Sequence, residues 1–214
     1  MMSEPAELYD AILTGNARKA EEVTKAALEA GVDASELLGK YMIPAMDEVG
    51  KRFECNEYFV PELLIAARAM KTALELLTPQ LAASGAKAAG RVVIGTVQGD
   101  LHDIGKNLVA SMLEGGGFEV VDLGVDVPPD RFVEEVDKQG GEAIVALSAL
   151  LTTTMTQMRA VIEALEQSGL RKQTKVMIGG APITQQYAEE IGADGYADNA
   201  SAAVHLARQL VEAN

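Results

Sequence analysis

Apolar residues recur at helical spacing in four segments of the first 80 residues. A first helix around Leu8 ends at Gly15, and a second ends at Gly31. A third is expected to bend near Pro44, and Pro61 can start a fourth because proline suits the first turn of a helix. Four amphipathic helices predict a small antiparallel bundle.

Beyond residue 90 the pattern changes to short β-branched or apolar runs that alternate with helical ones. Strands are expected in 91–97, 118–125, 143–150, 175–180 and 193–197, and helices in 106–114, 129–138, 154–168, 183–191 and 199–212. This alternation predicts a parallel α/β sheet of five strands with helices on both faces. We expect the flavodoxin-like (Rossmann-like) order 2-1-3-4-5, in which ligands bind at the carboxyl ends of strands 1 and 3.

The segment 79–90, PQLAASGAKAAG, is small, polar and without periodicity. Such a composition is typical of a flexible connection between folding units. We therefore expect a helical bundle cap domain over 1–80 and an α/β domain over 91–214, joined by a linker at 79–90.

Composition narrows the classes of function. The chain carries 18 Lys and Arg against 32 Asp and Glu, a net charge of −14, which disfavours binding to nucleic acid or anionic membranes. Its single cysteine, Cys55, cannot form an intrachain disulfide, which fits a reducing compartment. We see no signal peptide, and no apolar run reaches the ~20 residues that span a bilayer. The expected location is the cytoplasm.

The most unusual segment, GDLHDIGKN at 99–107, follows the first expected strand. Gly99 and Gly105 allow a loop that a flat ligand can approach closely. Asp100 lies two residues before His102, so its carboxylate can accept a hydrogen bond from one imidazole nitrogen and leave the other for a metal. His102 is therefore a candidate metal ligand.

Other interpretations of this segment remain open. His102 could cap the following helix or bind a loop carbonyl. A phosphate-binding loop is a weaker rival, because the spacing from Gly99 to Lys106 is one residue too long and Asn107 stands where a Ser or Thr should bind magnesium. The spacing of a dinucleotide-binding fingerprint is absent as well.

Two further loops are expected at the same edge of the sheet. Hydroxyls of Ser148, Thr152 and Thr154 follow the third strand, where Thr154 could extend the hydrogen-bonded chain from His102 through Asp100. Thr152 could also cap the next helix. Gly179 and Gly180 follow the fourth strand and remove side chains there. Together these loops predict a slot for a long, flat molecule.

The motif Asp100-x-His102-x-x-Gly105 with Ser148-x-Leu150 and Gly179-Gly180 resembles the cobalamin-binding module of methionine synthase and related corrinoid proteins. The resemblance covers the whole second domain, including Asp122-Leu123-Gly124-Val125. It extends to Val49-Gly50-Lys51-Arg52-Phe53 and Phe59-Val60-Pro61 in the first domain. The chain is most similar to the stand-alone corrinoid proteins of methylamine, methanol and methoxyaromatic methyltransferase systems.

The resemblance implies roles for individual residues. His102 would be the lower ligand of cobalt, Asp100 would tune it, and Thr154 would stand where methionine synthase has a serine, so that these three form the expected catalytic group. Phe59 would cover the upper corrin face, although it could equally be an aromatic of the bundle core. The other residues expected to contact cobalamin are Gly99, Leu101, Asp103, Ile104, Gly105, Ser148, Leu150, Thr152, Gly179, Gly180, Asp198, Asn199 and Ala200.

The resemblance also implies a function in methyl transfer. Cob(I)alamin would take a methyl group from a substrate-specific methyltransferase, becoming methylcobalamin, and a second methyltransferase would pass that group to tetrahydrofolate or a similar acceptor. A reductive activase is a further expected partner, and the chain alone would not be a complete enzyme. Two alternatives are the cobalamin subunit of an adenosylcobalamin mutase and a cobalamin sensor. The four-helix cap argues against the first, and the lack of a basic patch against the second.

Replacing Phe59 by Ala is expected to alter the photolability of a methyl–cobalt bond in the loaded protein, because an aromatic cap would shield the upper face. The measurement is the rate of photolysis of bound methylcobalamin. An unchanged rate would remove the capping role of Phe59.

Overall fold

A computed structural model of the chain describes residues 5–84 and 88–213. They form two units, one made of residues up to 88 together with 111–117, and the other of 89–110 with 118–213. The predicted combination of an N-terminal helical bundle and a C-terminal Rossmann-like sheet is confirmed.

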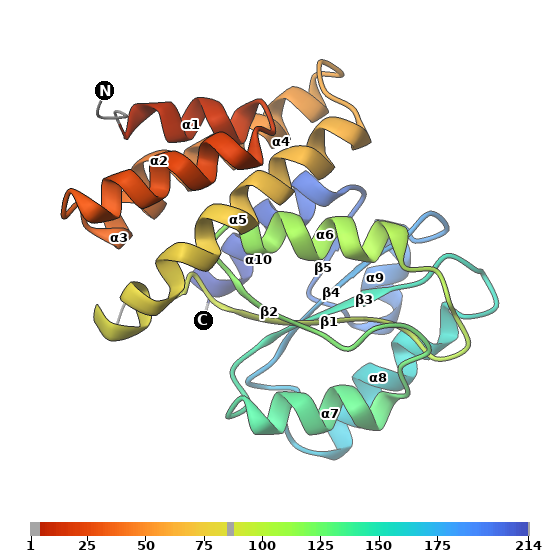
Figure 1. Cartoon of the computed structure of the whole chain (residues 1–214). Coiled ribbons are helices and arrows are strands. Elements are labelled where there is room, and N and C mark those ends of the chain that lie inside the picture. Colours follow the sequence, from red (N-terminus) through yellow and green to blue (C-terminus); the bar gives the residue numbers. More distant parts are fainter. Residues whose placement is uncertain (1–4, 85–87, 214) are drawn as a thin grey trace. The chain divides into compact units, whose positions relative to one another are not determined.

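The N-terminal unit is built from amphipathic helices (Figure 1). Asn16 caps the second helix by accepting a hydrogen bond from the Lys19 amide, and Asp33 caps the third in the same way from Glu36. The elements are α1 (Ala6–Leu13), α2 (Ala17–Glu29), α3 (Ala34–Leu37), the π-helix η1 (Leu38–Met42), α4 (Ile43–Glu54) and α5 (Val60–Ser84). Large buried side chains such as Leu8, Met46 and Met70 form its core.

Close to Pro44, where we expected a bend, the structure has the π-helical turn η1, which joins α3 to α4. Proline has no N–H to donate to the carbonyl one turn earlier. A wider turn directly before it lets the helix continue around that missing bond.

Helix α5 is longer than the spacing predicts, because it continues through Pro79 to Ser84. The first half of the segment 79–90, which we expected to be a flexible connection, is therefore helical. Residues 85–87 lie outside the described part of the chain. The domain limits 1–80 and 91–214 stay a prediction.

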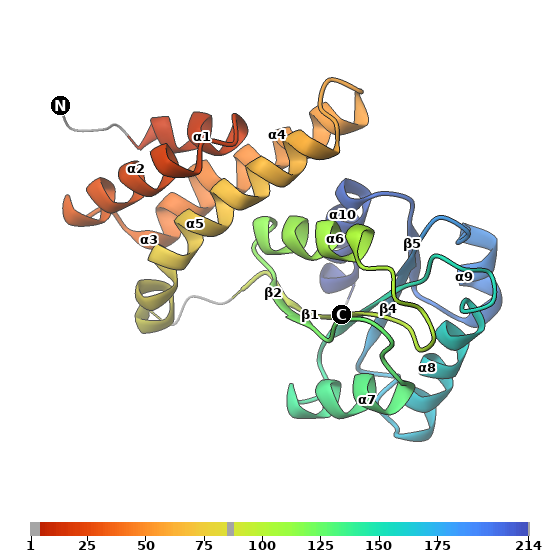
Figure 2. The same ribbon diagram turned by 45° about the vertical axis from the view of Figure 1, so that its right-hand side comes forward.

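The second unit contains a sheet of five parallel strands in the order β2-β1-β3-β4-β5, as predicted. The strands are β1 (Arg91–Thr96), β2 (Glu119–Asp122), β3 (Ile144–Ser148), β4 (Lys175–Gly179) and β5 (Gly195–Ala197). They alternate with α6 (Ile104–Gly115), α7 (Pro129–Lys138), α8 (Thr156–Gln167), α9 (Gln185–Ile191) and α10 (Ala200–Glu212). Figures 1 and 2 show α7 and α8 on one face and α6 and α10 on the other.

One face of the sheet holds a core formed by β1, β3 and β4 with α7, α8 and α9. Phe132 of α7 is fully buried there. Its ring lies over Gly95 of β1, where an added Cβ atom would come within 2.8 Å of a ring carbon. A bare glycine in the strand therefore makes room for the largest side chain of this core.

Within the residues that the structure describes, no helix combines the length and the apolar character needed to cross a membrane.

Phe132→Ala is expected to lower the free energy of unfolding of the sheet unit by about 3 to 5 kcal/mol, because it removes a buried ring and leaves a cavity over Gly95. Phe132→Leu should cost less, since it refills part of that volume. Urea unfolding followed by amide exchange in β1 and β3 measures both. Equal stability of the alanine variant and the original chain would show that this packing contributes little.

Candidate functional site

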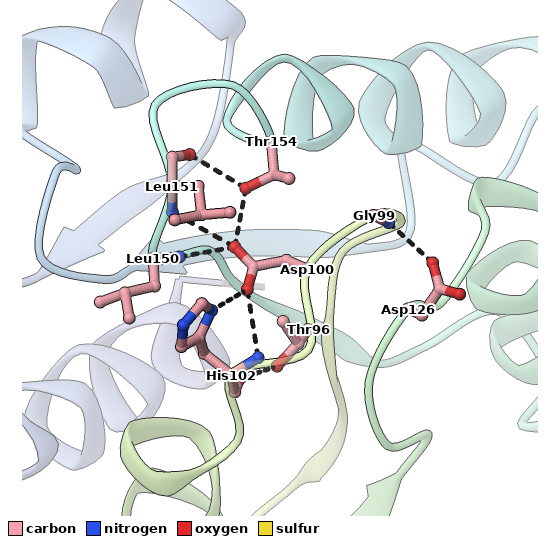
Figure 3. A network of polar contacts seen from close by, with 8 residues as sticks. All are labelled: Thr96, Gly99, Asp100, His102, Asp126, Leu150, Leu151 and Thr154. Carbon is pink, nitrogen blue, oxygen red and sulfur yellow. Dashed lines mark hydrogen bonds and ion pairs between the residues drawn. The ribbon is translucent and has the colours of Figure 1, made fainter.

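The candidate residues gather at the carboxyl edge of the sheet. Thr96, Ser148 and Gly179 occupy one level at the ends of β1, β3 and β4, because Ser148 pairs in register with each of the other two. All strands are parallel, so the loops that follow them emerge at the same edge. Figure 3 shows the loop after β1 and the loop after β3 meeting at the Asp100 side chain.

Asp100 is completely buried and connects these two loops. Its Oδ1 lies 2.6 Å from His102 Nδ1 and accepts the His102 backbone N–H at 3.2 Å. Its Oδ2 accepts hydrogen bonds from the Thr154 hydroxyl at 2.7 Å and from the backbone N–H groups of Leu150 and Leu151 at 2.8 and 3.3 Å. The structure thus contains the predicted series of hydrogen bonds from His102 through Asp100 to Thr154.

Donors surround this carboxylate, and they decide its charge. Burial alone would raise the pKa of Asp100, but the hydrogen bonds from Thr154, His102 and the Leu150 backbone outweigh burial and hold that pKa well below its usual range. Asp100 is therefore an anion at neutral pH, even though water does not reach it.

The charge of Asp100 sets the tautomer of His102. An ionised carboxylate can only accept, so Nδ1 must carry a proton, and in the neutral imidazole the lone pair is then on Nε2. The Asp100 side chain is buried, whereas that of His102 is 50% exposed. The imidazole is thus held by its inner nitrogen and presents the outer one as a potential ligand.

Apolar residues lie close to His102 in the sequence and on the neighbouring loop, and their side chains are exposed to solvent. Leu101 and Ile104 flank His102 and are 71% and 78% exposed, and Leu150 and Leu151 on the neighbouring loop are about half as exposed. An added Cβ at Gly105 would meet only open space. Exposed apolar groups of this kind are typical of a binding surface, and here they flank a histidine whose outer nitrogen could act as a ligand.

The other predicted site residues lie at the same edge but outside the hydrogen-bond network of Asp100, as far as the described residues show. Asp103 accepts a hydrogen bond from the Asn107 side chain at 3.1 Å. Ser148 is half-buried at the end of β3, and Thr152 is exposed. Asn199 caps α10 by accepting from the Ala202 amide and donates to exposed Asp198 beside it, and Ala200 begins that helix.

The glycine pair at the end of β4 packs closely against the neighbouring strand ends. Gly180 has a φ of +135°, and an added Cβ would lie 1.9 Å from the Ala149 carbonyl oxygen. At Gly179 it would lie 3.0 Å from the Ala197 oxygen. Glycine here brings three neighbouring strand ends close together.

Lys106 is buried and its ammonium group contacts Asp122 at 2.5 Å and Asn107 at 2.6 Å. A P-loop lysine must reach a phosphate instead. The geometry therefore argues against the phosphate-binding alternative.

Phe59 belongs to the helical unit, where its side chain is 60% exposed. It is therefore not an aromatic of the bundle core, which was its alternative interpretation. Its backbone N–H donates to Glu62 at the start of α5. Whether Phe59 covers a corrin stays a prediction.

Sequence reasoning missed several residues of the site. The Thr96 hydroxyl donates to the His102 carbonyl at 2.9 Å, and Asp126 accepts the Gly99 N–H at 2.7 Å (Figure 3). Leu151 contributes a backbone donor to Asp100. A backbone donor has no signature in the sequence, whereas the positions of Thr96 and Asp126 beside the loop follow from the strand order.

Comparison with known proteins identifies the family of the chain. Residues 90–205 match the family described as B12 binding domain, and residues 6–78 match a second family with the same description. The chain belongs to the B12-binding corrinoid protein family. The resemblance inferred from Asp100-x-His102-x-x-Gly105 is thereby confirmed at the level of the family.

Relatives in this family match along nearly the whole chain. A trimethylamine corrinoid protein of Methanosarcina acetivorans is 46% identical over 208 residues, which are 96% of both chains. A cobalamin-binding protein from Desulfitobacterium hafniense has a similar structure, with 36% identity, a TM-score of 0.78 and coverage of 96% of this chain and 98% of that one. A methanol:cobalamin methyltransferase complex from Methanosarcina barkeri contains a chain with 30% identity and a TM-score of 0.84, covering 97% of this chain and 79% of that one.

The lowered pKa of Asp100 predicts an acid-sensitive sheet unit. Because the folded pKa lies below that of the unfolded chain, about 4, the stabilisation is complete above that pH and is lost as the pH falls through the folded value. Asp100→Asn cannot titrate, so its stability should be lower at neutral pH but should fall less steeply in acid. Urea unfolding from neutral to acidic pH measures this difference.

Asp130→Asn is the matched control, since it neutralises an exposed acid of α7. It should leave the acid dependence nearly as it is in the original chain. Parallel pH curves for the original chain and Asp100→Asn would contradict the lowered pKa.

Proposed function

We propose that this chain is a corrinoid protein that carries a methyl group in a methylamine methyltransferase system, with His102 as the protein ligand of cobalt. The observation that carries the proposal is the 2.6 Å contact between His102 Nδ1 and the buried Asp100 carboxylate. It fixes the proton on one ring nitrogen and leaves the other as a ligand.

The site suits a corrinoid in shape as well as in donor chemistry. Leu101 and Ile104 flank His102 in the same loop and are exposed, so they could offer apolar contact to the face of a broad, flat ring. Gly105 leaves open space next to them. When bound, the corrinoid supplies a cobalt centre that can hold and release a methyl group.

The protein's own contribution is to hold the ligand nitrogen and set its basicity. Asp100 keeps the Nδ1 proton in place and, as an anion, increases the electron density of the ring. Thr154 and the backbone N–H groups of Leu150 and Leu151 hold the carboxylate so that it cannot turn away. The hydroxyl of Thr154 also donates to the Leu151 carbonyl in an alternative contact of 2.9 Å, so its single proton can serve either acceptor.

The remaining residues are proposed to bind the peripheral groups and the nucleotide tail of the cofactor. Ser148, Thr152, Gly179 and Gly180 would border the tail, together with Asp198, Asn199 and Ala200 at the start of α10. The support is their position at one edge of the sheet, because their strands end at the same level as β1.

The relatives point to the substrate class and the partners. Several are named trimethylamine or dimethylamine corrinoid proteins, and the methanol system provides a solved complex with its methyltransferase. We therefore propose a methylamine as the methyl donor, delivered by a substrate-specific methyltransferase. A second methyltransferase acting on tetrahydrofolate or a similar acceptor, and a reductive activase, complete the proposed set of partners. The cytoplasmic location stays a prediction.

His102→Ala tests the proposal. The variant should keep the fold, because the side chain is half exposed, and should lose coordination of cobalt by the protein. The absorption spectrum of the cobalamin-loaded protein should therefore shift to that of a form without a nitrogen ligand from the chain.

The matched control is His205→Ala, which removes the other histidine of the chain. This side chain is exposed on α10, and its loss should leave the spectrum unchanged. An identical spectrum for His102→Ala and the original chain would refute the assignment of His102.

A further inference from the structure

We propose that Thr96 and Asp126 are positioning residues that hold the backbone of the loop 99–102 and thereby place the His102 imidazole. The inference rests on the proposed function, in which His102 is a ligand of cobalt. We call these two side chains the loop clamp. The hydrogen bonds of both side chains go to the backbone of the loop and not to the imidazole, so the loop clamp would act on the imidazole through the backbone (Figure 3).

Thr96, the last residue of β1, is 0% exposed and lies among apolar neighbours such as Val97. Its backbone is already paired, because its N–H donates to the Gly124 carbonyl and its carbonyl accepts the Val127 N–H, both at 3.0 Å. The hydroxyl is therefore not needed for the sheet. It donates instead to the His102 carbonyl at 2.9 Å.

Asp126, in the loop between β2 and α7, contacts the same segment from another side. Its carboxylate accepts the Gly99 N–H at 2.7 Å, and its own N–H donates to the Asp100 carbonyl at 3.0 Å. It does so with a φ of +54°, which is unfavourable for residues other than glycine, although Asp and Asn tolerate it best. A strained conformation persists where the surrounding contacts require it.

The loop clamp matters because the imidazole has little other support. The side chain of Asp100 is held by the loop after β3, while the backbone at 99, 100 and 102 is held by Thr96 and Asp126. The His102 ring is half exposed, and its Nδ1 contact reaches back to Asp100 of the same loop. A shift of the loop would therefore move ligand and carboxylate together.

Coordination to a metal is short and directional, so a small displacement of the ligand weakens it. Removing one hydrogen bond of the loop clamp should lower the affinity for hydroxocobalamin roughly five- to tenfold, the size expected for one such bond. The loss should require the imidazole, because the loop clamp acts on the corrinoid only by placing it.

Asp126→Gly and Asp126→Asn separate the hydrogen bond from the backbone strain. Glycine adopts the positive φ without strain but has no acceptor for the Gly99 N–H. Asparagine keeps an acceptor and tolerates the same φ. We expect the affinity to fall in the glycine variant and to stay within about twofold of the original in the asparagine variant.

Thr96→Val and Thr96→Ser form the second pair. Valine keeps the shape and loses the donor, whereas serine keeps the donor. The matched control is Thr174→Val, because Thr174 is also buried and its hydroxyl donates to the Gly141 carbonyl at 3.1 Å, directly before β4 and far along the chain from the loop. Thr96→Val should lower the affinity, and Thr96→Ser and Thr174→Val should leave it nearly unchanged.

A double-mutant cycle with His102→Ala distinguishes positioning from general structural support. Each variant is titrated with hydroxocobalamin, with and without His102→Ala. We expect Asp126→Gly to weaken binding roughly five- to tenfold when His102 is present and to have almost no effect when it is absent. Equal losses in both backgrounds, or no loss with His102 present, would overturn the inference.

Amide hydrogen exchange on the chain without corrinoid provides a second readout. The Gly99 amide should exchange faster in Asp126→Gly than in Asp126→Asn, and unchanged exchange would contradict the loop clamp. This readout also serves if Thr96→Val folds poorly.

The two proposals can fail separately. If His102→Ala alone leaves affinity and spectrum unchanged, the proposed function fails. If His102→Ala changes both while the double-mutant cycle shows no coupling, only the inference about the loop clamp fails.

Discussion

The hydrogen bond between the buried Asp100 carboxylate and His102 Nδ1 is the constraint on which the site depends. A carboxylate without access to water is stable as an anion only when donors surround it. The donors come from its own loop and from the loop after β3, so the Asp100 carboxylate joins two segments that are distant in the sequence. The same bond decides which imidazole nitrogen is available as a ligand.

The sheet makes this arrangement possible. In the order β2-β1-β3-β4-β5, β1 lies between β2 and β3, so the loop after β1 has a neighbouring loop on each side. The loop after β3 binds the Asp100 side chain, and the loop after β2 binds the backbone through Asp126. The glycines at the end of β4 allow the adjacent strand ends to lie close together. Both neighbouring loops thus hold the loop that carries the imidazole, although the imidazole itself is exposed.

The helices and strands could be predicted from the sequence, because they follow from local apolar periods and turn residues, and the strand order could be predicted because alternating strands and helices favour a flavodoxin-like sheet. His102, Asp100 and Thr154 could be predicted as a chain because the first two are close in sequence and the third follows the neighbouring strand. Thr96 and Asp126 follow strands next to the loop or end them, but their hydrogen bonds with 99–102 could not be predicted, since these bonds depend on three-dimensional register. The helical course of 79–84 was also missed, because Pro79 and the small residues after it resemble a linker when only composition is considered.

The most direct test of the account is the electron paramagnetic resonance spectrum of the chain loaded with cob(II)alamin, recorded with natural and with ¹⁵N-labelled histidine. A ligating ¹⁴N nucleus splits each cobalt line into a triplet, whereas ¹⁵N splits it into a doublet. The account predicts a triplet that becomes a doublet on labelling, and a spectrum of His102→Ala that does not respond to the label. A spectrum that does not respond to the label would contradict the claim that His102 binds cobalt.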